Sequence, residues 1–271
     1  MLGKRIITAL IGMAYTVYVI NFGQWLYALT ITFVAMVAWH EFQRMVAQQN
    51  IHCIYWLGMT SVLLVCSTAW LGNSYEALAI LVGMILIALT QCIIFRPDCQ
   101  ITDAAFTVLG VCYIGVLFSH LILLRFYEST FGLSTTMDQG TAYLWIAFLG
   151  TWASDTFAFF VGSTFGKHKL CPLISPGKTI EGSLGGMFGS LLAVACFGWF
   201  IHLEWIHVVV LGLIVGVMAP VGDLVESAIK RFAKVKDSGT LLPGHGGVLD
   251  RFDSLLFVVP AVYYYVFVLL D

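Results

Sequence analysis

The sequence predicts an all-α, polytopic integral membrane protein with about nine transmembrane helices and a cytoplasmic N-terminus. Three observations lead to this prediction. Hydrophobic residues make up 60% of the 271 residues, and the mean hydropathy is +0.92, whereas soluble domains hold about 45–50% apolar residues. The apolar residues gather into runs long enough to cross a bilayer core of about 30 Å, which takes roughly 20 residues. Lys and Arg are distributed very unevenly among the segments that connect these runs.

Nine apolar runs are the predicted helices, because a backbone surrounded by lipid must satisfy its own hydrogen bonds. The first run follows Lys4 and Arg5, and a short polar break at 202–204 separates the seventh run from the eighth. The runs lie near residues 6–21, 24–47, 54–72, 75–95, 104–125, 142–162, 183–202, 205–225 and 254–270.

The positive charges orient the chain, since cytoplasmic segments are enriched in Lys and Arg. With nine crossings and the N-terminus inside, twelve of the thirteen Lys and Arg residues fall on the cytoplasmic side and only Arg125 falls outside. One missed helix would invert every later segment and destroy this asymmetry. The C-terminus is therefore predicted outside, and the two longest polar segments, 163–182 and 226–253, share the cytoplasmic face.

Composition excludes some classes of protein and divides the chain in two. A net charge of −2 does not suit nucleic-acid binding, which calls for a strongly basic face. The seven cysteines form no CxxC pair and are interpreted as residues of the membrane core. We expect no cleaved signal peptide. Residues 1–125 form apolar spans with short loops, and residues 126–271 carry the polar chemistry.

Charged residues concentrate in the segment 227–253, between two apolar runs. Charge close to a bilayer is costly, so it suggests function. Within this segment Gly246 and Gly247 allow backbone amides to approach an anion closely. His245 precedes them, and Asp250 and Asp253 lie three residues apart around Arg251. The eight charged residues are Lys230, Arg231, Lys234, Lys236, Asp237, Asp250, Arg251 and Asp253.

Acidic residues also occur within or near three of the predicted helices. Asp223 and Glu226 share one helix face, so a cation or a lysine is expected between them. Asp155 lies about two turns inside the sixth run and is expected to meet a cation or a polar cavity. Glu41 is interpreted as a packing residue or as a salt-bridge partner of Arg44.

The segment 175–182, SPGKTIEG, follows the sixth run. Ser175 and Pro176 predict a helix start there, with Ser as N-cap and Pro at the first position, and the amides of that helix would suit a phosphate. A P-loop is excluded because Pro172 occupies the position of its first glycine. Beyond this point small residues four apart, such as Gly182 and Gly186, predict close helix packing; they permit a homodimer without requiring one.

The charged segment resembles the signature of the phosphatidate cytidylyltransferase (CDP-diacylglycerol synthase) family. The upstream motif of that family resembles Asp155–Thr156–Phe157 together with 175–182, with a departure at Gly177. The resemblance is specific in the C-terminal half only. The matching residues of the signature are Ser227, Ile229–Lys230–Arg231, Lys236–Asp237, Gly239, Leu242–Pro243, His245–Gly246–Gly247 and Asp250–Arg251–Phe252–Asp253.

This resemblance implies an enzyme that joins CTP to phosphatidic acid in a bacterial cytoplasmic membrane, with Mg²⁺ as cofactor and a second cation left open. It implies Asp223 and Asp250 as metal ligands. The implied catalytic residues are Asp223, Lys230, Arg231, Lys236, Asp237, His245, Asp250, Arg251 and Asp253. The implied substrate-binding residues are Asp155, Ser175, Lys178, Thr179, Glu181, Gly246 and Gly247, with Arg251 favoured for the nucleotide and Lys178 for the lipid phosphate.

Other functions stay open on the sequence. A cytidylyltransferase or a CTP-dependent kinase for another membrane lipid would use similar groups. A cation-conducting protein could use Asp155, Asp223 and Glu226 as an ion path, although few polar residues occupy the outer half of the spans. CDP-alcohol phosphotransferases are excluded because their DGxxAR motif is absent from the sequence.

Overall fold

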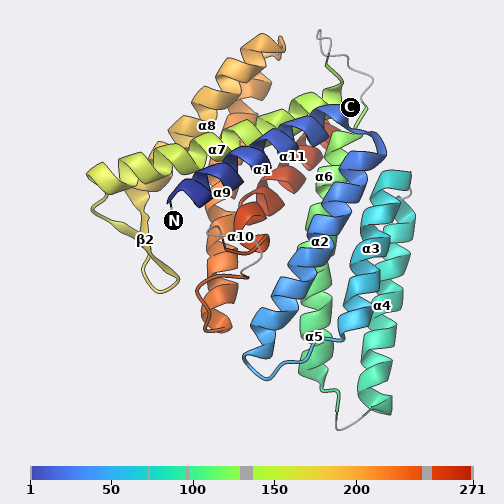
Figure 1. Cartoon of the computed structure of the whole chain (residues 1–271). Coiled ribbons are helices and arrows are strands. Elements are labelled where there is room, and N and C mark those ends of the chain that lie inside the picture. Colours follow the sequence, from blue (N-terminus) through green and yellow to red (C-terminus); the bar gives the residue numbers. More distant parts are fainter. Residues whose placement is uncertain (1, 73, 96–97, 129–136, 240–245, 270–271) are drawn as a thin grey trace. The chain divides into compact units, whose positions relative to one another are not determined.

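The computed structural model describes residues 2–72, 74–95, 98–128, 137–239 and 246–269. The chain forms two compact units, each made of two stretches of sequence. One unit comprises residues 1–123 and 230–251, and the other comprises residues 124–229 and 252–271. Most of the charged segment, residues 230–251, thus belongs with the N-terminal spans, whereas the sequence division at 125/126 kept it with the C-terminal half. Figure 1 shows the elements of both units.

The first unit consists of apolar helices around a buried aromatic core. Its elements are α1 (Leu2–Phe22), α2 (Gln24–Ala47), α3 (Tyr55–Leu71), α4 (Ser74–Ile94), α5 (Ile101–Gly110), the π-helical turn η1 (Val111–Val116) and most of α6 (Leu117–Arg125). Trp39 of α2 is fully buried. Its ring fits only because Gly58 and Gly110 lack side chains, since an added Cβ would lie 2.0 Å and 2.7 Å from ring atoms.

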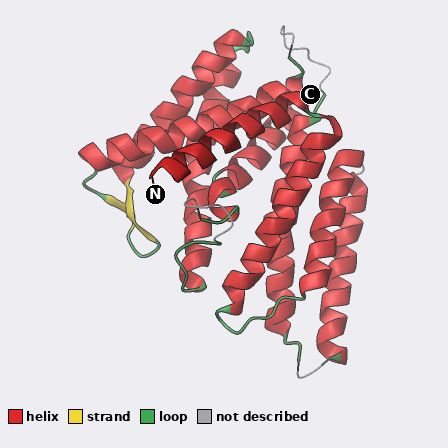
Figure 2. Ribbon diagram, viewed as in Figure 1, coloured by secondary structure: helices red, strands yellow, loops and turns green. Residues whose placement is uncertain are grey.

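Among the described residues, the second unit consists of three long helices, one shorter helix and a β-hairpin. Its elements are α7 (Gln139–Phe165), β1 (Lys169–Cys171), β2 (Ser175–Thr179), α8 (Ile180–Phe200), α9 (Trp205–Phe232) as far as Ile229, and α11 (Leu255–Leu269). The short α10 (Leu249–Phe252) begins in the first unit and ends in the second. Figure 2 shows the hairpin in yellow between α7 and α8.

The predicted small-residue packing of α8 is confirmed, and α7 is the neighbour. A Cβ on Gly186 would lie 2.9 Å from Ser154 Oγ, and a Cβ on Gly189 would lie 2.7 Å from Phe157. The next face of α8 packs on α9, where Ser190 Oγ donates a hydrogen bond to the Gly212 carbonyl at 2.9 Å. These small residues therefore serve contacts within one chain.

The predicted fold class, an all-α polytopic membrane protein, is confirmed. Among the described residues six helices are long and apolar enough to cross a membrane, and three shorter apolar helices occur at Leu10–Phe22, Tyr55–Leu71 and Leu255–Leu269. Each of the nine predicted runs coincides with one of these helices, the fifth with the continuous helix Ile101–Arg125. The number of crossings and their orientation stay predictions.

The helix predicted to start at Ser175 is wrong. Residues Ser175–Thr179 form strand β2, which pairs antiparallel with β1, and the helix begins five residues later at Ile180. The physical reason is a better cap further along the chain: Thr179 Oγ1 accepts a hydrogen bond from the Gly182 amide at 3.1 Å, as an N-cap residue does. Pro176 is tolerated in a two-stranded hairpin, which consists of edge strands only.

Candidate functional site

Three carboxylates come together in the second unit. The group comprises Asp223, Glu226 and Asp253, with one oxygen of each within 4.8 Å of the others. Asp223 and Glu226 lie one turn apart on α9, and Glu226 is fully buried. Asp253 approaches because Gly222 has no side chain, since a Cβ there would lie 2.5 Å from the Asp253 carbonyl. So many negative groups at this spacing repel each other unless cations compensate them.

Lys178 supplies one such cation from strand β2. Its Nζ lies 2.7 Å from the Asp223 carboxylate and 3.3 Å from the Pro220 carbonyl. The sequence predicted a cation or a lysine between Asp223 and Glu226, and the structure has a lysine beside Asp223. Asp155 of α7 interacts electrostatically with both Asp223 and Lys178, so residues far apart in the sequence form one charged group within the second unit.

The hairpin that carries Lys178 is fixed to the start of α8. The Glu181 carboxylate accepts hydrogen bonds from the Lys167 amide at 3.1 Å and the His168 amide at 3.2 Å, and it lies 2.6 Å from His168 Nδ1. Thr179 caps the helix in the same place. Thr179 and Glu181 were predicted to bind substrate; in this structure their described contacts hold the hairpin. Ser175 lies at the other end of β2, opposite Cys171.

The first unit contains the other part of the predicted constellation, organised around Asp250. Asp250 Oδ1 accepts a hydrogen bond from Lys230 Nζ at 2.8 Å. Its Oδ2 accepts from the Ser238 amide at 3.0 Å, the Ser238 hydroxyl at 2.9 Å and the Gly247 amide at 2.8 Å. One carboxylate thus joins the segments on both sides of residues 240–245. Those residues, which include the predicted catalytic residue His245, lie outside the described residues.

Glu41 is a member of this group that the sequence interpretation missed. The side chain is 5% exposed, and its carboxylate accepts hydrogen bonds from the Val248 and Leu249 amides, both at 2.9 Å. The Ser238 hydroxyl lies 3.3 Å away. Instead of the expected pairing with Arg44, Glu41 holds the charged segment to α2. An isolated carboxylate within an apolar span was the available signal.

Two glycines of the signature make this contact possible. A Cβ on Gly247 would lie 2.0 Å from Ser238 Oγ, and a Cβ on Gly239 would lie 2.5 Å from Glu41 Oε1. Gly246 has a φ of +83°, which only glycine adopts readily. The Gly247 amide, predicted to help bind phosphate, donates to Asp250 in this structure.

Four of the remaining predicted residues of the first unit are accessible. Lys230 is partly buried through its contact with Asp250, whereas the side chains of Arg231, Lys236, Asp237 and Arg251 are exposed. The two predicted metal ligands belong to different units: Asp223 joins Glu226 and Asp253 in the second, and Asp250 binds Lys230 and Ser238 in the first.

Comparison with known proteins gives consistent matches. The Cytidylyltransferase family matches residues 3–269. A protein named phosphatidate cytidylyltransferase from Staphylococcus aureus (strain COL) is 43% identical over 182 residues. Proteins of the same name from Staphylococcus epidermidis and Staphylococcus saprophyticus are 42% and 40% identical over 183 residues. Each match covers 66% of this chain and 65% of the length of the relative.

Proposed function

Since the chain belongs to the cytidylyltransferase family, we propose that it transfers CMP from CTP to phosphatidic acid, with CDP-diacylglycerol and pyrophosphate as products. The names of the bacterial relatives support this acceptor. The observation that carries the proposal is the charged group of the second unit, in which three carboxylates gather beside Lys178. Such an arrangement suits a cation and a phosphate.

The reaction explains why so few reactive side chains are needed. An oxygen of the lipid phosphate attacks the α-phosphorus of CTP, the bond from that phosphorus to the bridging oxygen breaks, and pyrophosphate leaves with the electron pair. A phosphomonoester has a second pKa near 6, so the acceptor is already a competent nucleophile at neutral pH. The protein then contributes positioning and charge neutralisation.

The cluster of three carboxylates in the second unit fits a magnesium ion. Mg²⁺ binds oxygen ligands at about 2.1 Å, so opposite ligands lie about 4.2 Å apart, close to the 4.8 Å limit that encloses these three oxygens. Asp223, Glu226 and Asp253 would hold the ion, which would neutralise charge on the triphosphate. Asp250 is the second metal ligand proposed from the sequence, and Asp250→Asn should then raise the Mg²⁺ concentration needed for half-maximal activity.

The basic residues are proposed to bind phosphate groups. Lys178 is assigned to the lipid phosphate, because its ammonium already lies next to carboxylates that would be occupied by a metal ion. Arg251 is assigned to the nucleotide. The side chains of Arg231 and Lys236 are exposed and can contact a soluble ligand. The side chain of Lys230 is oriented by its hydrogen bond to Asp250.

We propose a bacterial cytoplasmic membrane as the location, with the charged segments on its cytoplasmic side. The long apolar helices among the described residues and the bacterial source of the relatives support a membrane location. The distribution of Lys and Arg supports the orientation, and CTP is available only on the cytoplasmic side.

The decisive experiment is an assay of the purified protein in detergent with CTP, Mg²⁺ and phosphatidic acid, following pyrophosphate and CDP-diacylglycerol. Parallel reactions offer diacylglycerol or an isoprenoid phosphate as acceptor. We expect product with phosphatidic acid only. Transfer of phosphate to diacylglycerol would indicate a kinase, and product from the isoprenoid phosphate alone would indicate a different acceptor. Cation flux in sealed vesicles without CMP transfer would overturn the proposal.

A further inference from the structure

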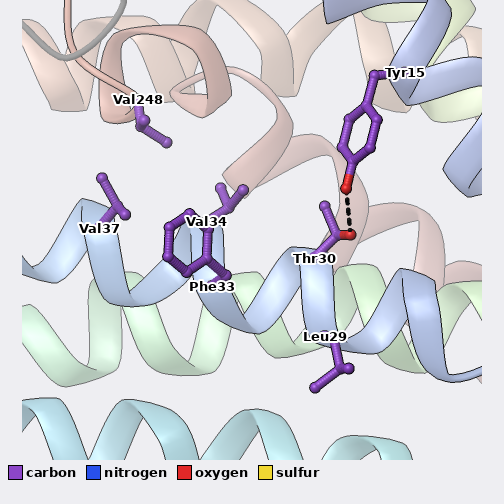
Figure 3. Close-up of a pocket in the computed structure, with 7 residues that line it drawn as sticks. All are labelled: Tyr15, Leu29, Thr30, Phe33, Val34, Val37 and Val248. Atoms are coloured by element: carbon purple, nitrogen blue, oxygen red, sulfur yellow. Dashed lines mark hydrogen bonds between the residues drawn. The ribbon is translucent and has the colours of Figure 1, made fainter.

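An apolar groove of about 430 Å³ lies in the first unit, between α1, α2 and the end of the charged segment. Figure 3 shows its lining, with Phe33, Val34 and Val37 of α2 near Val248. The polar atoms of the lining satisfy each other, because Tyr15 Oη lies 3.0 Å from Thr30 Oγ1. The rest of the lining is hydrocarbon, so the groove suits a ligand segment without polar groups.

This groove adjoins the charged segment directly. Val248, which lines the groove, donates its amide hydrogen bond to Glu41 at 2.9 Å. Val37 and Glu41 lie four residues apart on α2, on the same face of the helix. Val248 is also two residues before Asp250, which binds Lys230. Within one unit, therefore, hydrocarbon lining gives way to charged groups within about one turn of α2.

The direction of the groove suits an amphiphile. The predicted topology places the C-terminal end of α2, with Glu41 and Arg44, at the cytoplasmic surface. From Val37 the groove extends along α2 to Leu29, about 12 Å at 1.5 Å per residue, towards the hydrocarbon. Phe33 is 65% exposed and Tyr15 is 49% exposed, so the groove is open to lipid from the side.

We propose that this groove binds one acyl chain of the phosphatidic acid substrate and measures its length. The inference rests on the proposed function and adds a specificity site to it. With the chain in the groove, the glycerol lies beyond Val37, at the end of the groove that the predicted topology places towards the cytoplasm. The volume falls within the range of about 300–1,000 Å³ that is usual for ligand sites. Bilayer lipid is as apolar as leucine, so an acyl chain gains no hydrophobic free energy by moving from the bilayer into the groove. The groove therefore selects among acyl chains by how well they fit it.

The test compares dibutyryl and dioleoyl phosphatidic acid as substrates of the full chain in mixed micelles, because a four-carbon chain is too short to extend past Val37 along the groove. Val37→Phe fills the groove, and Val34→Leu fills it more mildly in case the first variant does not fold. Val82→Phe is the matched control, since Val82 lies on α4, is 50% exposed and does not line the groove. Equal thermal midpoints of the variants and the wild type verify the fold.

We expect Val37→Phe to lower kcat/KM for the dioleoyl substrate relative to the dibutyryl substrate by roughly 5- to 150-fold, as overpacking of a site does. Val34→Leu should shift the ratio in the same direction, and Val82→Phe should leave it unchanged. An equal loss on both substrates, or an unchanged ratio in both filled variants, would overturn the proposal.

A second measurement separates this inference from the proposed function. Phosphatidic acid with a photoreactive group midway along one acyl chain is crosslinked to the wild type and to each variant, and the modified peptides are identified by mass spectrometry. We expect labelling of residues 29–37, reduced in Val37→Phe and retained in Val82→Phe. Labelling without CMP transfer would reject the enzymatic function and keep the lipid site. CMP transfer with labelling only elsewhere would reject the groove and keep the function.

Discussion

The ammonium of Lys178 lies 2.7 Å from the carboxylate of Asp223, although 45 residues separate them in the sequence. Asp223 belongs to the cluster of three carboxylates that fits a metal ion, and Lys178 is proposed to bind a phosphate. In this structure the lysine neutralises part of the acidic group, so a bound metal ion and the lysine compete for the same carboxylate. The pairing predicts that the two residues act as a unit.

Substitution of both residues tests this coupling. Asp223→Asn should lower kcat by at least about 100-fold, as the loss of an electrostatic stabiliser does. Lys178→Met should lower kcat/KM by roughly 10- to 150-fold, since a charge-assisted hydrogen bond contributes about 1.5–3 kcal/mol. When kcat/KM is compared for all variants, the double variant should be much less impaired than the product of the two single effects. Lys169→Met on the same hairpin is the control, and strictly multiplicative effects would show that the two residues act independently.

Metal removal tests whether the cluster of three carboxylates in the second unit holds a magnesium ion. Chelation with EDTA should abolish activity, and Mg²⁺ should restore it. Glu226→Gln and Asp253→Asn should each raise the Mg²⁺ concentration needed for half-maximal activity, because each removes one hard oxygen ligand. Binding is measured separately, as the rise in thermal midpoint with Mg²⁺, which follows from preferential binding to the folded state. Glu204→Gln is the control, since Glu204 is 82% exposed and precedes α9; an equal Mg²⁺ response in all variants would place the ion elsewhere.

The helices could be predicted from the sequence, because each apolar run is long and a single segment surrounded by lipid must satisfy its backbone hydrogen bonds within itself, as a helix does. The hairpin could not, since strands of three and five residues carry little periodicity and the Ser–Pro pair imitated a helix start. The partners of Glu41 were also beyond reach: Val248 is 207 residues away in the sequence. Asp223 and Glu226 were paired by helical spacing, but the approach of Asp253 depends on the backbone contact at Gly222.

Glu41→Gln tests whether Glu41 positions the charged segment. The amide keeps the size of the side chain but replaces one acceptor oxygen with a donor, which then faces a backbone N–H. A buried donor left unsatisfied costs about 1–3 kcal/mol. We expect a lower thermal midpoint and faster hydrogen exchange at the Val248 and Leu249 amides, with reduced activity. Glu76→Gln on α4, where the residue is exposed, serves as control, and unchanged exchange at both amides would refute this role.

Gly186→Ala tests the packing of α8 on α7. The new methyl group would lie 2.9 Å from Ser154 Oγ and 3.0 Å from the Ser154 carbonyl, and overpacking of this kind costs about 1–3 kcal/mol. We expect a lower thermal midpoint in detergent. Gly83→Ala is the matched control: nothing lies within 4 Å of the added Cβ, and alanine is favoured over glycine in a helix. Equal stability of the two variants would mean that α7 and α8 can move apart at Gly186 without a loss of folding free energy.

The topology is tested with single cysteines in a background without the seven native ones. Leu173, between β1 and β2, is 93% exposed, and Tyr75, at the start of α4, is 94% exposed. The distribution of positive charges predicts Leu173 on the cytoplasmic side and Tyr75 outside. A membrane-impermeant maleimide should therefore label Tyr75→Cys in intact cells and Leu173→Cys only in inside-out vesicles. A separate variant that keeps only the native Cys53 is the control for background labelling, because burial raises the pKa of its thiol to about 12 and the reactive thiolate is then scarce at neutral pH. Labelling of both introduced cysteines from the same side would require an even number of crossings to lie between them where the proposed topology has three, and the nine-span arrangement would be rejected.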